Sequence, residues 1–118
     1  MHALFGTAGT PDEFKEQGYK TSLQIPGFLS RYGLDCFEYQ CGRGVNVSTE
    51  TAQAFGRKAK EHNIALSLHS PYYISLSSEK EESRLKSVDY ILQSARAAHD
   101  IIGAVQGQGN VMLLGLEQ

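Results

Sequence analysis

The 118 residues of this chain are enough for one domain with a hydrophobic core and hardly enough for two. The composition is that of a soluble globular protein, and a net charge of −2 argues against a dedicated DNA-binding module, though not against an enzyme with a local basic site. No apolar run approaches the roughly 20 residues that cross a bilayer, and the first residues lack the pattern of a signal peptide, so we expect a cytoplasmic protein.

Short elements fill the first third of the chain. Residues 3–6 predict a short first strand. Thr10 and Glu13 fit a capping box, which predicts a short helix over residues 11–17. A second short helix is expected to follow Pro26, and a glycine stands where each of these two helices should end.

Two strands with a helix between them come next. Residues 34–41 alternate and are rich in aromatic side chains, residues 48–63 begin with a Ser or Thr cap, and residues 64–69 form a short apolar run. Both cysteines, Cys36 and Cys41, fall in the first of these strands. Five residues of strand span about 16 Å, whereas a disulfide needs Cα atoms within about 7 Å. We therefore expect two free thiols, as in a reducing compartment.

The most regular helix of the chain follows. Ser78 and Glu81 fit a second capping box and open a helix to about residue 102. Its apolar positions alternate at spacings of three and four, and we expect them to face the core. They are Leu85, Val88, Leu92, Ala95, His99 and Ile102, so that His99 is expected to be a buried core histidine and His62, at the end of the preceding helix, a surface residue.

Residues 111–117 complete an alternation of strands and helices, because their aliphatic run predicts a buried strand. Such alternation predicts a parallel sheet with helices outside it. The fold class is therefore α/β, and either an open sheet or part of a (β/α)₈ barrel satisfies the pattern.

Polar residues stand at the carboxyl ends of two predicted strands. In residues 64–69, Ala65, Ser67 and His69 share one face, opposite the large aliphatic side chains. The last strand places Glu117 at the same end, where parallel α/β folds build their sites. Imidazole and carboxylate together suit zinc or manganese, but a catalytic zinc usually needs three protein ligands. The alternative is a strand-end histidine that is hydrogen-bonded to the backbone.

Two segments carry a family resemblance. The stretches LDCFEYQCGRG and LSLHSPYYISLSS, residues 34–44 and 66–78, resemble the amino-terminal half of the endonuclease IV family of apurinic/apyrimidinic endonucleases, among the xylose isomerase-like TIM barrels. The resemblance implies a partial (β/α)₈ barrel with parallel strands and outer helices, and zinc-dependent cleavage of DNA at abasic sites. It also implies that His69 is a zinc ligand and that Tyr72 and Arg43 contact DNA.

The end of the chain departs from the family pattern. The family's fourth strand, with its metal-binding histidine, is absent, and NVMLLGLEQ resembles the fifth strand, whose glutamate bridges two zinc ions. On this resemblance Glu117 is both a metal ligand and a catalytic residue. A TIM barrel takes about 250 residues, so we expect residues 1–118 to form one partial barrel domain, truncated or internally deleted and inactive alone.

Two other functions stay open. A sugar isomerase or epimerase of the same superfamily would hold manganese or magnesium, and Glu38 would then matter more. A non-catalytic domain would instead self-associate through its open sheet edges. Separately from these functions, the structural alternative to DNA contact is that Tyr72 and Tyr73 only cover the barrel mouth and that Arg43 only belongs to a glycine-flanked turn.

Overall fold

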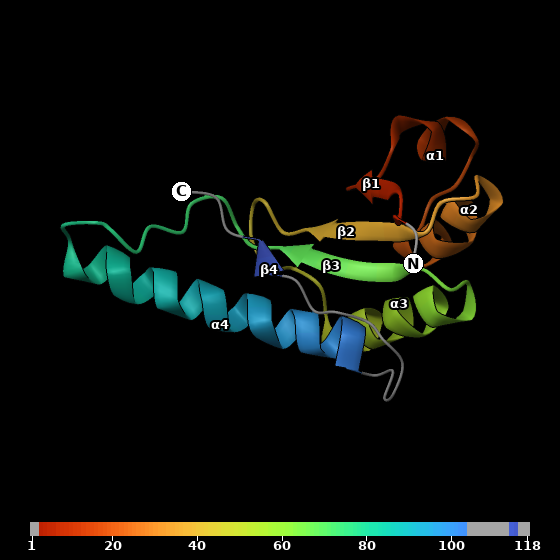
Figure 1. Cartoon of the computed structure of the whole chain (residues 1–118). Helices are drawn as coiled ribbons and strands as arrows, with labels where there is room; N and C mark the ends of the chain where they lie inside the picture. Colours follow the sequence, from red (N-terminus) through yellow and green to blue (C-terminus); the bar gives the residue numbers. More distant parts are fainter. Residues whose placement is uncertain (1–2, 104–113, 116–118) are drawn as a thin grey trace.

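A four-stranded parallel sheet forms the centre of the molecule. The computed structural model describes residues 3–103 and 114–115. In chain order the strands are β1 (Gly6–Ala8), β2 (Cys36–Gln40), β3 (Ala65–His69) and β4 (Leu114–Gly115), and each pairs with the next. Figure 1 shows this order in space. The expected α/β class is confirmed, and the sheet is that of a partial (β/α)₈ barrel with outer helices.

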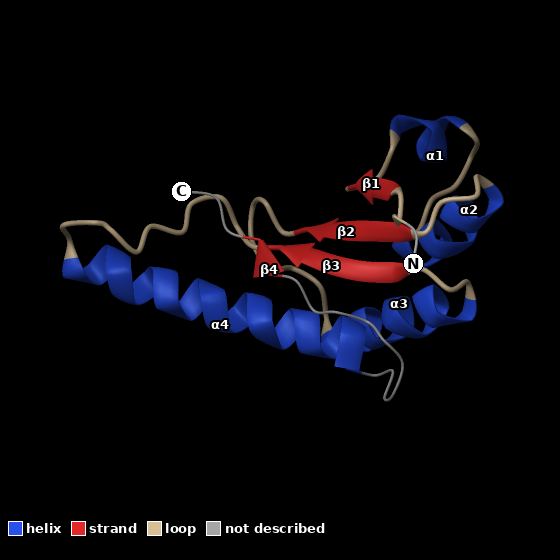
Figure 2. Ribbon diagram, in the orientation of Figure 1, coloured by secondary structure: helices blue, strands red, loops and turns tan. Residues whose placement is uncertain are grey.

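Helices connect the strands. They are α1 (Asp12–Glu16), α2 (Ile25–Arg31), α3 (Thr49–Glu61) and α4 (Glu81–Gly103), and a 3₁₀ turn, η1 (Ser22–Gln24), precedes α2. Figure 2 shows α3 and α4 below the sheet, with α1 and α2 at the end where the strands begin. A parallel sheet joined by helices in this way has one face covered by them and a second face available for a site.

The covered face holds the hydrophobic core. Phe37 of β2 and Leu66 and Leu68 of β3 are buried in one cluster with Phe55 of α3 and Ile101 of α4. The alternate residues of β3, Ala65, Ser67 and His69, are only partly buried. The predicted division of this strand into an apolar and a polar face is therefore confirmed.

The first strand lies later than expected. It begins at Gly6, where the prediction ended it, while Leu4 and Phe5 precede it and stay exposed. Backbone contact explains the shift, since a Cβ on Gly6 would lie 1.7 Å from the carbonyl oxygen of Cys36. Only glycine allows the two strands to approach so closely at this point.

Neither predicted capping box begins its helix. Pro11 is the N-cap of α1, which has no side-chain cap, so Thr10 and Glu13 do not form the expected pair. Before α4, the Ser78 hydroxyl accepts from the amide of Lys80 at 3.2 Å rather than from that of Glu81. Such local turns compete with capping for the same hydroxyl.

The caps of the other two helices are closer to expectation. Helix α2 begins at Ile25, one residue before Pro26 rather than after it, because a proline costs nothing in the first turn, where amides have no partner within the helix. The predicted cap of α3 is confirmed: Ser48 Oγ accepts from the amide of Thr51 at 3.2 Å.

Three helices end in the same way. Gly18 after α1, Gly33 after α2 and Asn63 after α3 have left-handed backbones, with φ of 87°, 70° and 58°. The residue after each one donates back to the last turn, as Ile64 N does to the Ala59 carbonyl at 2.8 Å. This is the Schellman motif, which satisfies carbonyls that the helix leaves without partners. The glycines expected at the ends of α1 and α2 are confirmed, and Asn63 ends α3 in the same way, directly before β3.

Helix α4 buries a different side from the one predicted. Leu85, Val88 and Leu92 are 63%, 48% and 49% exposed, and His99 is exposed as well. The buried residues are Ser87, Ser94, Ala97, Ala98 and Ile101. The expectation of an apolar stripe in the core, with His99 as a core histidine, is therefore wrong for the described residues.

Close packing between helices explains the reversal. A Cβ on Gly56 of α3 would lie 1.8 Å from the carbonyl oxygen of Ile101, so the two backbones nearly touch. Only small side chains fit beside such a contact. Ser94 is buried on this side of the helix, and its hydroxyl donates to the carbonyl of Tyr90 at 2.8 Å. Ser87, nearer the start of α4, is buried against the preceding loop, where its hydroxyl accepts from the amide of Ser75 at 2.8 Å.

Candidate functional site

The polar residues of the sheet gather on its second face, near the carboxyl ends of the strands. In the register of the sheet, Gln40 of β2 lies beside His69 of β3, and His69 lies beside Gly115 of β4. Glu38 is two pairs earlier, beside Ser67. Neighbouring residues in a parallel register point to the same face. The second face therefore presents an imidazole, a carboxylate and an amide together.

His69 is held in one tautomer by the backbone. Its Nδ1 lies 2.7 Å from the carbonyl oxygen of Ser70, and a carbonyl only accepts. Nδ1 therefore carries a proton, which makes Nε2 the nitrogen that would ligate a metal. This is the arrangement of a metal-ligating histidine, whose other nitrogen donates to a carbonyl or carboxylate. The two expectations for His69, backbone hydrogen bond and metal ligand, are thus compatible.

Glu38 is positioned by a neighbour on its own strand. Gln40 Nε2 donates to Glu38 Oε1 at 2.7 Å, and the Glu38 carbonyl accepts from the amide of Gly9 at 3.0 Å. A groove of about 550 Å³ runs along β1, β2 and β3 and is lined by Glu38 and Ser67 among others. The sequence predicts that Gln40 and Glu38 share one strand face, but it gave no role to Gln40, whose hydrogen bond to Glu38 is seen only in the structure.

The described residues hold only part of a metal site. Within residues 3–103 and 114–115, no three His, Cys, Asp or Glu side chains come together as a ligand set. His69 supplies one donor of the right chemistry, and Glu38 is a carboxylate on the same face. The predicted ligand and catalytic residue Glu117 lies outside the described residues, two positions after Gly115.

Two loops at the same edge carry the residues predicted to contact DNA. Arg43 lies in the loop after β2 and Tyr72 in the loop after β3, and both are exposed. The amide of Tyr72 donates to the carbonyl of Gly42 at 3.2 Å, which joins the two loops directly beside Arg43. The structure thus brings Arg43, Tyr72 and the strand end with His69 to one edge of the sheet.

An aromatic ladder supports the second loop. Tyr72 packs edge-on against Tyr73, with ring centroids 5.6 Å apart, and Tyr73 packs against Tyr90 of α4 at 4.8 Å. Partial burial raises the pKa of Tyr73, and the neighbouring Tyr90 and Tyr72 raise it further through electrostatic repulsion of the phenolate. The edge-to-face contacts of the three rings tie the loop to α4.

The turn after β3 holds one buried polar atom that the sequence did not single out. In the described part of the chain, the hydroxyl of Ser70 is buried and has no hydrogen-bond partner. Leaving a hydroxyl in this state costs about 1–3 kcal/mol. Ser70 also supplies the carbonyl that orients His69, so the residue with the unsatisfied hydroxyl is directly beside the candidate ligand.

The cysteines agree with the sequence prediction. Cys36 and Cys41 are both free. Burial raises the pKa of both thiols, and the charge of Asp35 raises that of Cys36 further. Raised pKa values leave both groups as unreactive thiols near neutral pH. Neither is a candidate nucleophile.

Open α/β sheets and (β/α)₈ barrels both build their sites from polar side chains at the carboxyl ends of parallel strands, as the sheet here does. Residues 26–105 match the family described as xylose isomerase-like TIM barrel, and the chain belongs to that family. It is also 29% identical over 103 residues to an uncharacterised protein of Methanocaldococcus jannaschii. The match covers 82% of this chain and 33% of the relative, so the chain spans about a third of that relative's length. Among the described helices, none is long and apolar enough to cross a membrane.

Proposed function

We propose that this chain supplies part of the site of a zinc-dependent phosphodiesterase, similar to endonuclease IV, that acts on DNA at abasic sites. The observation that carries the proposal is the joining of the Arg43 and Tyr72 loops beside the strand that ends in His69. Arginine suits phosphate, and an exposed aromatic ring suits an opened base step. The activity belongs to an assembled barrel, and this chain supplies His69, Tyr72 and Arg43 to it, with Glu117 as the proposed second ligand.

His69 fits the proposed metal in chemistry and tautomer. His69 would be one ligand of a divalent metal, which would supply activation of water and neutralisation of phosphate charge. The carbonyl of Ser70 holds the imidazole in position through Nδ1, while Arg43 and Tyr72 hold the DNA backbone and the distorted base step. The described residues do not bring three potential ligands together, so the site is not complete within them.

Zinc binding tests the ligand assignment. Calorimetric titration of the full chain with zinc is expected to show a site that His69→Ala removes, with a loss of affinity of about tenfold or more. His62→Ala and His99→Ala are matched controls, because both histidines lie away from the strand ends. Equal zinc affinity in the His69 variant and in the wild type would show that His69 is not a ligand.

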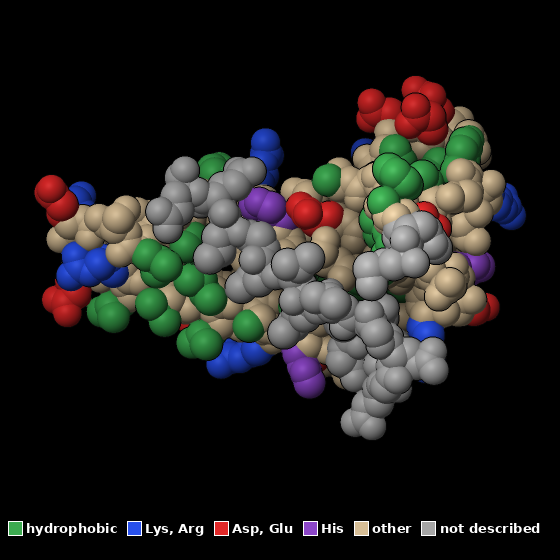
Figure 3. All heavy atoms as spheres, viewed as in Figure 1, with side chains coloured by type: hydrophobic (Ala, Val, Ile, Leu, Met, Phe, Trp, Pro, Cys, Tyr) green, Lys and Arg blue, Asp and Glu red, His purple; other side chains and the backbone are tan. Residues whose placement is uncertain are grey.

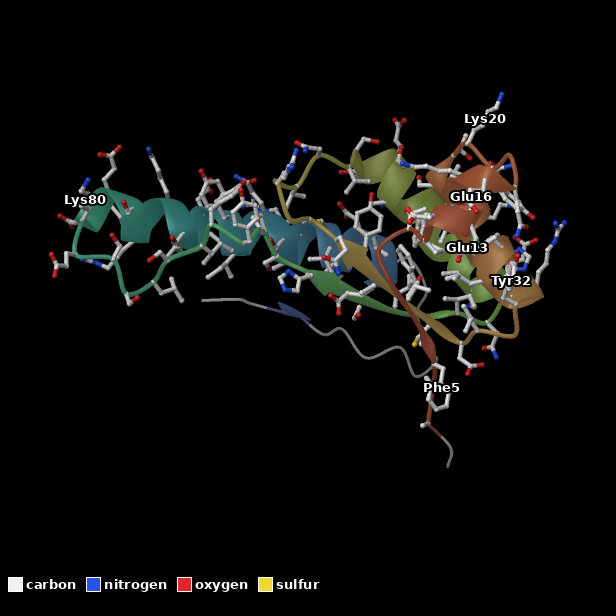
Figure 4. All side chains as sticks on the ribbon, turned by 90° about the horizontal axis from the view of Figure 1, so that it is seen from above. Phe5, Glu13, Glu16, Lys20, Tyr32 and Lys80 are labelled. Carbon is white, nitrogen blue, oxygen red and sulfur yellow. The ribbon has the colours of Figure 1, made fainter. Side chains whose placement is uncertain are left out.

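DNA binding tests the substrate. Fluorescence anisotropy should show tighter binding to a duplex with an abasic-site analogue than to the intact duplex. Arg43→Ala is expected to lower affinity for both duplexes and to reduce the salt slope by about one. Tyr72→Ala should reduce the preference for the abasic duplex. Tyr32→Ala is the control, since Tyr32 is a similarly exposed tyrosine beside α2, far from the loops (Figure 4). Indifference to the abasic site would refute this substrate.

A sugar isomerase or epimerase that uses manganese or magnesium is the second candidate. The observation in its favour is Glu38, which lies on the face of His69 and is oriented by Gln40. A carboxylate and an imidazole over a sheet of small residues suit a hydroxylated substrate. Conversion of a ketose, with loss of activity in Glu38→Gln but not in Tyr72→Ala, would favour this candidate over the nuclease.

A further inference from the structure

A pocket of about 560 Å³ lies between α2 and α3, at the end of the sheet where the strands begin. Its volume is in the range of sites that bind small molecules. One side of it comes from α2 and the residues before that helix, and the other from the last turn of α3. We call it the α2–α3 pocket.

Both walls of the α2–α3 pocket belong to neighbouring units of the barrel. Helix α2 leads into β2 and α3 follows it, and α3 packs against both η1 and α2. In a (β/α)₈ barrel, further units lie beyond β1 and beyond α4, so they do not enter the space between α2 and α3. The pocket is therefore part of the outer surface of the barrel and is not a place that another strand–helix unit fills.

His62 occupies one side of the pocket without a polar partner. A Cβ on Gly27 would lie 3.4 Å from its Nε2, so the glycine of α2 leaves room for the imidazole. The imidazole is half-buried, and within residues 3–103 and 114–115 it makes no hydrogen bond or ion pair. Both of its nitrogens are therefore available to a ligand.

The polar part of the pocket is basic. Arg31, Lys58 and His62 line it, and none of the described residues that line it is acidic. Arg31 donates to the hydroxyl of Tyr19 and lies over its ring, with the guanidinium carbon 5.9 Å from the ring centroid. This contact holds the guanidinium in place and leaves most of its five donors for another group. Figure 3 shows basic, acidic and histidine side chains close together at this end of the molecule.

The acidic neighbour is Glu61, which forms an ion pair with Lys58 at 3.4 Å. Both side chains are exposed, with 48% and 61% of their surface accessible, and exposed pairs of this kind are weak. An anion in the pocket can therefore compete with Glu61 for the ammonium group.

The helix ends by themselves explain only part of this arrangement. Basic residues in a last turn complement the helix dipole, and both α2 and α3 end here. The carbonyls of these ends already have partners, because the amides of Leu34 and Ile64 donate to those of Leu29 and Ala59 at 3.0 and 2.8 Å. The basic side chains are thus not needed to satisfy the helix ends.

The same pocket has an apolar part, lined by Tyr19, Leu23 and Phe28. Guanidinium, ammonium and imidazole groups together suit the several oxygens of a phosphate. We propose that the α2–α3 pocket binds a small organic phosphate monoester, with the phosphate between Arg31, Lys58 and His62 and the organic group on the apolar part. The inference is independent of the proposed function, because His69 lies at the other end of β3.

Binding of phenyl phosphate to the full chain is the first test. A titration through the millimolar range, followed by heteronuclear NMR, should shift the amide signals of the turns that line the pocket. Arg31→Gln should raise the dissociation constant about tenfold. Lys60→Gln is the matched control, because Lys60 is exposed on α3 and does not line the pocket. The absence of saturable shifts, or equal losses of affinity in the two variants, overturns the proposal.

His62→Ala is the second variant, because Arg31→Gln also removes the contact with Tyr19. His62 has no such contact, so the fold should stay intact by circular dichroism while phenyl phosphate binds more weakly. An unchanged dissociation constant in His62→Ala overturns the placement of the phosphate beside this residue.

Other anions test the class of ligand. Benzoate carries a single charge and inorganic phosphate lacks the ring, so both should bind more weakly than phenyl phosphate. Equal affinity for benzoate overturns the choice of phosphate, and equal affinity for inorganic phosphate overturns the role of the organic group. Displacement of phenyl phosphate by an intact DNA duplex, at the same concentration of phosphate groups, would indicate a DNA backbone contact and overturn the small-molecule assignment.

Discussion

Strand β3 and helix α4 lie next to each other in the chain, and both have regular apolar patterns, yet only β3 buries the side that its pattern predicts. In β3 the large aliphatic residues Leu66 and Leu68 are buried and His69 is left on the other face. In α4 the large residues Leu85 and Leu92 are exposed, while serine and alanine are buried. The same hydrophobicity argument therefore succeeds on one element and fails on its neighbour.

The difference lies in how many sides an element has. A strand in a sheet has two faces, so the larger apolar set is buried on the side that the helices cover. A helix can turn any side to its neighbour, and the distance to that neighbour decides which residues fit. Because α3 presents Gly56, the backbone of α4 comes close to it at Ile101, and the buried side of α4 carries the small residues Ser94 and Ala98. The close approach of the backbones, rather than side-chain size, therefore decides which side of α4 is buried. The buried serines are tolerated because their hydroxyls donate to carbonyls within the helix.

Truncating one leucine of each element tests this comparison with the largest expected effect. Leu68→Ala should lower the free energy of unfolding by about 2–5 kcal/mol, because Leu68 is 1% exposed and leaves a cavity. Leu85→Ala should change it by no more than about 0.5 kcal/mol. Urea denaturation at low protein concentration measures both without a contribution from association. Equal losses would mean that α4 buries its leucines after all.

A methyl group at the helix contact is the next test. Gly56→Ala should destabilise the fold by about 1–3 kcal/mol, although alanine is the better helix former. The added Cβ would meet the Ile101 carbonyl at 1.8 Å, so the two helices must separate. Gly42→Ala is the control, because nothing lies within 4 Å of a Cβ there. Stabilisation by Gly56→Ala in thermal denaturation would contradict the close packing of α3 and α4.

Local sequence rules predicted the fold to the extent that a local cause decided it. The parallel order of strands follows from the alternation of elements, and Ser48 and Gly33 mark helix boundaries by their own chemistry. The start of β1 at Gly6 could not be predicted, because it depends on the carbonyl of Cys36, thirty residues later. The buried side of α4 depends on Gly56 in the same way.

The candidate site was predictable where one strand decided it. His69 follows from strand parity and from its place at a strand end, and both hold in the structure. The joining of the Arg43 and Tyr72 loops rests on a backbone hydrogen bond between residues 42 and 72, which no side-chain pattern reveals. The roles of His69, Tyr72, Arg43 and Glu117 stay predictions, and Glu117 also lies outside the described residues.

The turn between α3 and β3 allows a test with a smaller expected effect. It concerns the left-handed residue that ends α3 directly before the strand. Asn63 has φ of 58°, so Asn63→Ala should cost about 1 kcal/mol, because a Cβ is strained in the left-handed region and alanine lacks the local hydrogen bonding of asparagine. Asn63→Gly should be neutral or slightly stabilising, since glycine adopts this conformation freely. Thermal denaturation of the two variants measures the difference. Equal stability of the alanine and glycine variants would argue against a left-handed residue at this helix end.

The smallest expected effect concerns pH and the covered side of β2. Burial raises the pKa of the Cys41 thiol above its ordinary value of 9.0, so the folded state disfavours the thiolate. Titration of this thiol therefore leaves the free energy of unfolding unchanged well below pH 9.0. The free energy of unfolding falls as the pH rises from 9.0 through the raised pKa of the folded state. Unfolding of wild type and Cys41→Ala, compared near neutral pH and one unit above 9.0, isolates this loss, which the variant should lack.

Cys36, partly exposed, should react first with a thiol reagent, and faster labelling of Cys41 would contradict its burial in the core beside Phe37.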